Sequence, residues 1–60
     1  MKLQQAVKTL ITAKAFIGMS NHFFLKGDQL KAEHCEARAN DLFLSIPDSV
    51  GSKARKVLGE

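Results

Sequence analysis

Residues 3–26 carry one uninterrupted helical pattern, which constrains the fold more than any other feature of the sequence. Apolar or small residues recur at steps of three and four, and the stretch contains no proline. This spacing is typical of a helix that packs against another helix. The large members are Leu3, Leu10, Ile17 and Phe24, and the small ones are Ala6, Ala13 and Ser20. We therefore predict a helix over about residues 2–26 whose inner face allows a close helix neighbour.

A turn and a second helix follow. Gly27 supplies the left-handed conformation that ends many helices, and the carboxylate of Asp28 suits the first N–H groups of the next helix. Pro47 disfavours helical geometry in the residue before it. The sequence thus predicts a tight turn at 27–28 and a helix over about 29–45, antiparallel to the first. Its expected inner stripe is Ala32, Cys35, Ala39, Leu42 and Ile46.

Past Pro47 the pattern predicts a short third helix, over about residues 49–58. Asp48 or Ser49 is the expected N-terminal cap. Its apolar side is expected to comprise Val50, Ala54, Val57 and Leu58. The whole chain of 60 residues is therefore expected to form a single all-α domain, an antiparallel helical hairpin with a short C-terminal helix.

A chain this short has a marginal core, and small domains compensate with disulfides, metals, regular packing or oligomerisation. The sequence has one cysteine, Cys35, so no internal disulfide can form. We interpret Cys35 as a small apolar residue on the inner face of the second helix. Packing and oligomerisation are the remaining sources of stability.

Each long helix also has a second apolar stripe. On the first it consists of Phe16, Met19 and Phe23; on the second, Leu30, Ala37 and Leu44 recur every seven residues. A two-helix unit has one inward face per helix, so these stripes need another cover. We predict a homodimeric four-helix bundle with Phe16, Met19, Phe23, Leu30 and Leu44 at the interface. The alternative is a broad apolar face that wraps around a monomer core.

The hairpin resembles a single tetratricopeptide-type helical repeat. The likeness rests on Phe16, Met19, Ser20 and Phe23 in the first helix, on Gly27-Asp28 at the turn, and on Ala32, Ala39 and Leu42 in the second. It departs at Glu36, where the family prefers a large aromatic residue, and at Pro47, which comes three residues late. The resemblance implies a close-packed hairpin but no peptide-binding groove, because such arrays need about three repeats or more.

A shorter segment, Asn40 to Val50, looks like the closing segment of the Hha family of nucleoid-associated modulators through Asn40, Leu42, Ile46-Pro47 and Ser49-Val50. Gly51 stands where that family has an aromatic residue. With either likeness, the general picture is that of a small bacterial, phage- or plasmid-type accessory protein.

Charge is unevenly distributed over the chain, whose formal net charge is +3. Residues 1–27 contain four lysines and no acid, whereas residues 28–46 are net acidic. On the first helix the lysines form no continuous stripe, so we interpret them as a solvated face. The cluster of Lys53, Arg55 and Lys56 is the better candidate for contact with nucleic-acid phosphates.

No residue pattern predicts catalysis or ligand binding. His34, Cys35 and their acidic neighbours lack the spacing of metal ligands, and no triad or phosphate loop occurs. We expect no enzyme activity, cofactor, metal, small-molecule ligand or membrane partner, and a cytoplasmic location. The predicted function is that of a small helical regulator or adaptor acting through protein contact; the alternative is a basic nucleic-acid-binding regulator.

Overall fold

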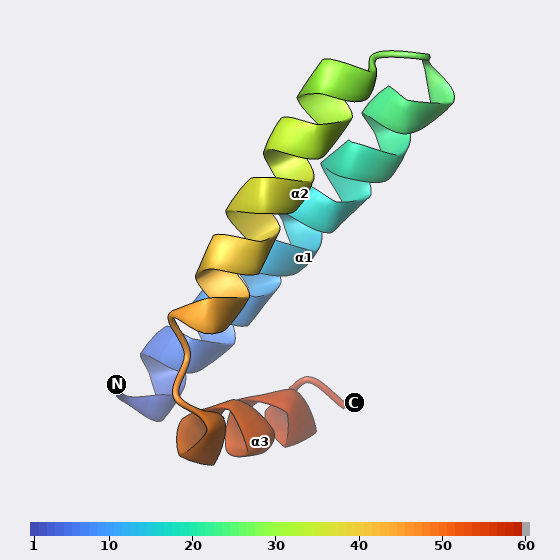
Figure 1. Ribbon diagram of the computed structural model, residues 1–60. Coiled ribbons are helices and arrows are strands. Elements are labelled where there is room, and N and C mark those ends of the chain that lie inside the picture. The colour runs from blue at the N-terminus through green and yellow to red at the C-terminus, as the bar shows by residue number, and fades with distance from the viewer. Residues whose placement is uncertain (60) are drawn as a thin grey trace.

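Three helices make up the protein in a computed structural model that describes residues 1–59. Helix α1 spans Leu3–Leu25, α2 spans Gln29–Leu44 and α3 spans Asp48–Val57. Helices α1 and α2 lie antiparallel and side by side, and α3 crosses the end of this hairpin that lies opposite the turn (Figure 1). The predicted all-α hairpin followed by a short helix is confirmed, while the structure contains one copy of the chain.

The turn between α1 and α2 has the geometry that the sequence predicts. Gly27 adopts a φ of 82°. Its N–H donates to the Phe24 carbonyl at 3.0 Å, and the Asp28 N–H donates to the Phe23 carbonyl at 2.9 Å. This pair of bonds is the Schellman motif, which satisfies carbonyls at a helix C-terminus. The Asp28 side chain then accepts a hydrogen bond from the Lys31 N–H at 3.2 Å, which caps the start of α2.

The connection from α2 to α3 differs from the predicted capping. Pro47 itself occupies the N-cap position of α3, with a φ of −61° and a ψ of 141°, and no side chain caps the helix. The predicted cap at Asp48 or Ser49 is therefore wrong, because Asp48 already lies within the first turn. Pro47 has no N–H to satisfy, and its carbonyl accepts the N–H of Gly51 at 2.8 Å.

Small side chains form the contact between α1 and α2. Ala13 on α1 is buried, as are three small residues of α2, Ala32, Cys35 and Ala39. Near the turn the Ser20 hydroxyl donates to the Ala32 carbonyl at 2.9 Å. Residues without long side chains let two helix backbones approach closely, and the hydroxyl bond fixes their position along each other.

The predicted inner face of α1 is correct for Ala6, Leu10 and Ala13 and wrong for its other large members. Leu3 and Ile17 are exposed, and Phe24 exposes 69% of its surface. The close approach along small residues explains this result. Because the backbones lie close together, a large side chain at the edge of the contact extends past the neighbouring helix and is not buried between the two helices.

The core of larger side chains lies at the end of the hairpin where α3 docks. Leu10 of α1, Ile46 before Pro47 and Ala54 of α3 are buried together with Ala6. Four half-buried apolar residues pack around this cluster: Val7, Phe43, Val50 and Leu58. Helix α3 thus covers the first turns of α1. In the half of the hairpin near the turn, the interior consists only of the contact between α1 and α2.

Candidate interaction surfaces

The apolar stripe on α2 points away from the rest of the molecule. Leu30 and Leu44 expose 81% and 85% of their surfaces, and Ala37 between them is also exposed. These three residues lie on the opposite side of α2 from Ala32, Cys35 and Ala39, which face α1. We call Leu30, Ala37 and Leu44 the outer stripe. Neither α1 nor α3 covers it.

The second stripe of α1 is placed differently. Phe16 and Phe23 are half-buried against α2, whereas Met19 is exposed. The Lys31 ammonium lies 5.5 Å from the centre of the Phe23 ring, within the range of a cation–π contact. Phe16 lines a shallow hollow of about 210 Å³ with Thr12, Arg38, Asp41 and Leu42. The hairpin itself therefore covers part of the two phenylalanines, which leaves Met19 as the freest member of this stripe.

Some exposed apolar residues had no place among the predicted interface residues. Leu25 is exposed to the same extent as Leu44, and each is the last residue of its helix. Ile11 on α1 and Val57 on α3 are also exposed. No sequence signal singled out Leu25, because it stands beside the turn and outside every periodic stripe.

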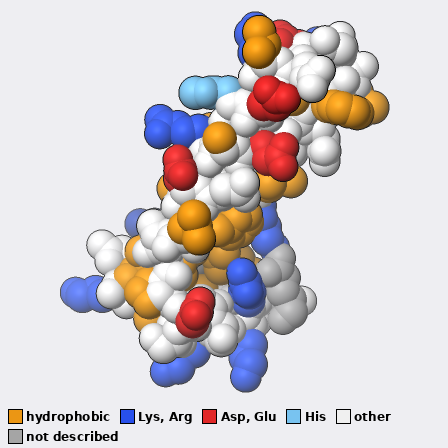
Figure 2. All heavy atoms as spheres, viewed as in Figure 1, with side chains coloured by type: hydrophobic (Ala, Val, Ile, Leu, Met, Phe, Trp, Pro, Cys, Tyr) orange, Lys and Arg blue, Asp and Glu red, His pale blue; other side chains and the backbone are white. Residues whose placement is uncertain are grey.

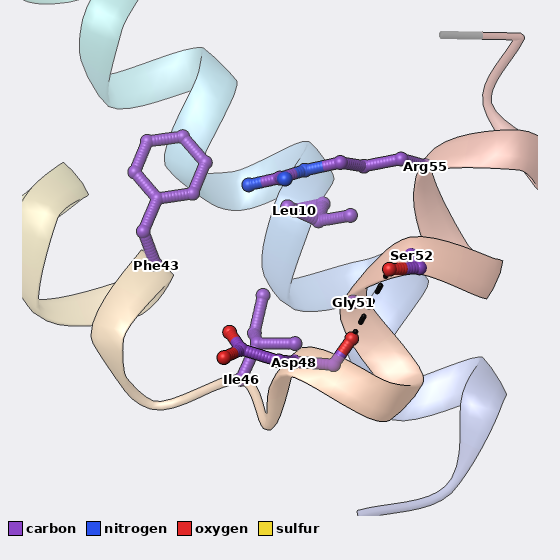
Figure 3. A pocket seen from close by; sticks show the side chains of 7 residues that line it. All are labelled: Leu10, Phe43, Ile46, Asp48, Gly51, Ser52 and Arg55. Carbon is purple, nitrogen blue, oxygen red and sulfur yellow. Dashed lines mark hydrogen bonds between the residues drawn. The ribbon is translucent and has the colours of Figure 1, made fainter.

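The predicted cluster of Lys53, Arg55 and Lys56 is divided over the surface of α3. Arg55 extends from α3 toward the ring of Phe43 and lies over Leu10 (Figure 3). It lines a hollow of about 150 Å³ together with Asp48 and Ser52 from its own helix. Lys53 and Lys56 are exposed and lie together on another side of α3, since helical positions three apart share a face.

Lysines from the start of α1 join these cations. Lys8 lines a shallow hollow with Leu3, Gln4, Val7 and Val57, which places it beside the last turn of α3. Lys2 stands immediately before α1, at the same end of the hairpin. Figure 2 shows Lys and Arg side chains gathered around the end where α3 lies, with most of the visible acidic side chains farther along the hairpin.

No cluster of metal ligands is assembled within residues 1–59. No three His, Cys, Asp or Glu side chains come close enough together to hold a metal ion in the described part of the chain. Cys35 is buried as a free thiol, and the adjacent His34 is exposed. No helix among the described residues combines the length and apolar character needed to cross a membrane.

Comparison of the chain with protein-family models, curated proteins and solved structures found no match in any of the three. The likenesses to a tetratricopeptide-type repeat and to the Hha family therefore remain local resemblances. Any functional conclusion rests on the surfaces described above.

Proposed function

We propose that this protein is a non-enzymatic helical adaptor or regulator that acts through protein contact and self-associates as a homodimer. The exposure of Leu30 and Leu44 is the observation that carries the proposal. Large apolar side chains aligned on one face mark protein interaction sites more often than isolated ones do. The outer stripe is the centre of the interface, whereas Phe16, Met19 and Phe23 belong to α1, which lies on the other side of α2.

The outer stripe is suited to pairing with a second copy of itself. Ala37 stands midway between Leu30 and Leu44, seven positions from each. A two-fold axis through the contact of two antiparallel α2 helices would bring Ala37 near its counterpart and each Leu30 near the other copy's Leu44. Two-fold dimers use such self-complementary surfaces. The small side chain of Ala37 allows the two α2 helices to approach at the centre, and each α1 then lies on the far side of its own α2.

The expected strength of this dimer is modest. Burial of one leucine side chain contributes about 1.5–3 kcal/mol, so four leucines contribute roughly 6–12 kcal/mol. Association of two proteins costs about 4–15 kcal/mol in lost motional freedom. The leucines alone therefore only about offset this cost. Self-association is accordingly expected to depend on concentration.

A pair of matched variants tests the interface. Leu44→Asp and Leu25→Asp each place a carboxylate at the last residue of a helix, on side chains of equal exposure. Their effects on the helix dipole are similar in kind, so they differ mainly in the surface that they change. Sedimentation velocity over a concentration series is expected to show a lower dimer fraction for Leu44→Asp and no change for Leu25→Asp.

The opposite result would remove the outer stripe from the interface. If Leu25→Asp dissociates the dimer and Leu44→Asp does not, the contact lies at the turn end of the hairpin. Equal losses in both variants would indicate a general charge effect. Circular dichroism of each variant verifies that the helices are retained.

A further inference from the structure

Five exposed cations surround one end of the molecule: Lys2, Lys8, Lys53, Arg55 and Lys56. We call them the basic end. Asp48 is the only acid in the stretches 1–14 and 47–58 that form it. None of these five side chains forms an ion pair with another residue of the described range 1–59. Because α3 docks against the first turns of α1, positive charges that are about 50 residues apart in the sequence lie at the same end of the molecule.

From this arrangement we propose that the basic end binds double-stranded nucleic acid through its phosphates. The proposal is independent of self-association, because none of the five cations belongs to the outer stripe. It also differs from a site made by the tail cluster alone, since it includes Lys2 and Lys8 of α1. The ligand is the phosphate backbone and not a particular base sequence.

The outer face of α3 has the composition expected of a phosphate-binding surface. Gly51 and Ala54 are buried, so the opposite side of the helix is the exposed one. That side carries four exposed polar residues, Ser49, Ser52, Lys53 and Lys56, of which Ser52 donates its hydroxyl to the Asp48 carbonyl at 3.3 Å. Hydroxyl and ammonium groups are among the donors that most often contact phosphate oxygens. An acid occurs only at the edge of this face, at Asp48.

The same face argues against a membrane surface as the partner. A helix that lies on a membrane inserts an apolar face into the lipid. Val50 and Ala54 of α3, and Leu58 directly after it, instead face the core. Val57 is exposed, but it lies beside Lys8 at the edge of the helix. The outermost side chains of α3 are polar and favour a hydrated, charged partner.

The dimensions of α3 also fit a duplex. An α-helix with its side chains is about 10–12 Å in diameter, and the major groove of B-DNA is about 12 Å wide; the ten residues of α3 are about 15 Å long. Double-stranded DNA carries one charge per about 1.7 Å of its axis, so a length of about 15 Å presents roughly nine phosphates. A duplex segment as long as α3 therefore presents more phosphates than the five cations of the basic end.

Salt dependence of duplex binding is the appropriate measurement. The affinity for a labelled 20-base-pair DNA of random sequence is followed by fluorescence anisotropy at several NaCl concentrations. Each neutralised phosphate contributes about −0.9 to the slope of log K against log salt, which gives about −4.5 for five contacts. Lys53→Gln/Lys56→Gln and Lys2→Gln/Lys8→Gln are each expected to reduce the magnitude of this slope by about 1.8.

Lys26→Gln/Lys31→Gln is the matched control. It removes the same net charge at the turn end of the hairpin, and it is expected to leave the slope unchanged. An equal loss in this control would overturn the proposal, because binding would then follow net charge alone. An unchanged slope in the Lys2→Gln/Lys8→Gln variant would also overturn the proposal. Binding to vesicles of anionic lipid without binding to the duplex would assign the basic end to a membrane. Circular dichroism verifies folding of every variant.

Discussion

The hydroxyl of Ser20 on α1 donates a hydrogen bond to the backbone carbonyl of Ala32 on α2, at 2.9 Å. The bond joins the two helices in the half of the hairpin that α3 does not reach. Both residues are small, so the bond exists only because the backbones are close together. It is therefore an indicator of the small-residue contact on which the hairpin depends.

Substitutions at Ser20 test this contact. Ser20→Ala removes the bond but leaves the Ala32 carbonyl free for its own helical bond, so a loss of about 0.5–1.5 kcal/mol in unfolding free energy is expected. Ser20→Leu adds bulk between the helices and is expected to cost more, about 1–3 kcal/mol. Urea unfolding followed by circular dichroism measures both. Equal stability of all three proteins would contradict the close contact.

Ala13 and Ala15 test the same contact with a matched pair. Ala13 is fully buried between α1 and α2, whereas Ala15 is exposed on α1. Ala13→Leu is expected to destabilise the fold by about 1–3 kcal/mol through overpacking. Ala15→Leu should change stability by less than about 0.5 kcal/mol, because it alters only the surface. Thermal unfolding distinguishes the two, and a greater loss for Ala15→Leu would place the hairpin contact on the wrong side of α1.

Two glycines are expected to respond to alanine with opposite signs. Gly27 has a φ of 82°, where a Cβ is strained even though no other atom lies near it. Gly27→Ala should therefore destabilise the protein by about 1–2 kcal/mol. A Cβ at Gly18 within α1 would also meet no neighbouring atom. Gly18→Ala should stabilise the fold by about 0.5–1 kcal/mol through higher helix propensity. The two melting temperatures, relative to the original chain, test both signs.

Leu10 is the largest fully buried side chain and links α1 to α3. Leu10→Ala is expected to cost about 2–5 kcal/mol, which is a large part of the stability of so small a domain. Leu25→Ala removes the same atoms from an exposed side chain and should cost less than about 0.5 kcal/mol. Chemical denaturation provides the values. Similar costs for the two variants would show that α3 does not form a core with α1.

The local features of the fold were predictable because they depend on short stretches of sequence. Gly27 and Asp28 determine the turn, and Pro47 determines where α2 ends. The lateral position of α2 on α1 was not predictable to the same degree. The heptad spacing placed Phe24 on the inner face, but the contact runs along small residues and through Ser20, and Phe23 is half-buried while Phe24 is exposed. That balance depends on the distance between two helices, which no single stripe specifies.

The candidate surfaces differ in the same way. Periodicity alone placed Leu30 and Leu44 on one line of α2, and the structure places both on its exposed side. The composition of the basic end could not be read from the sequence, because it depends on where α3 docks. That position brings Lys8 beside Val57 and turns Arg55 toward Phe43. Only the tertiary arrangement shows that the lysines of α1 and those of α3 share one end.

Solution mass over a concentration series is the measurement that tests the proposed self-association most directly. Multi-angle light scattering coupled to size-exclusion chromatography is expected to show a shift from the mass of one chain toward twice that mass as concentration rises. In Leu44→Asp this shift should move to higher concentration, while Leu25→Asp should behave like the original chain. A helical protein that retains the mass of one chain at every concentration would contradict the homodimer.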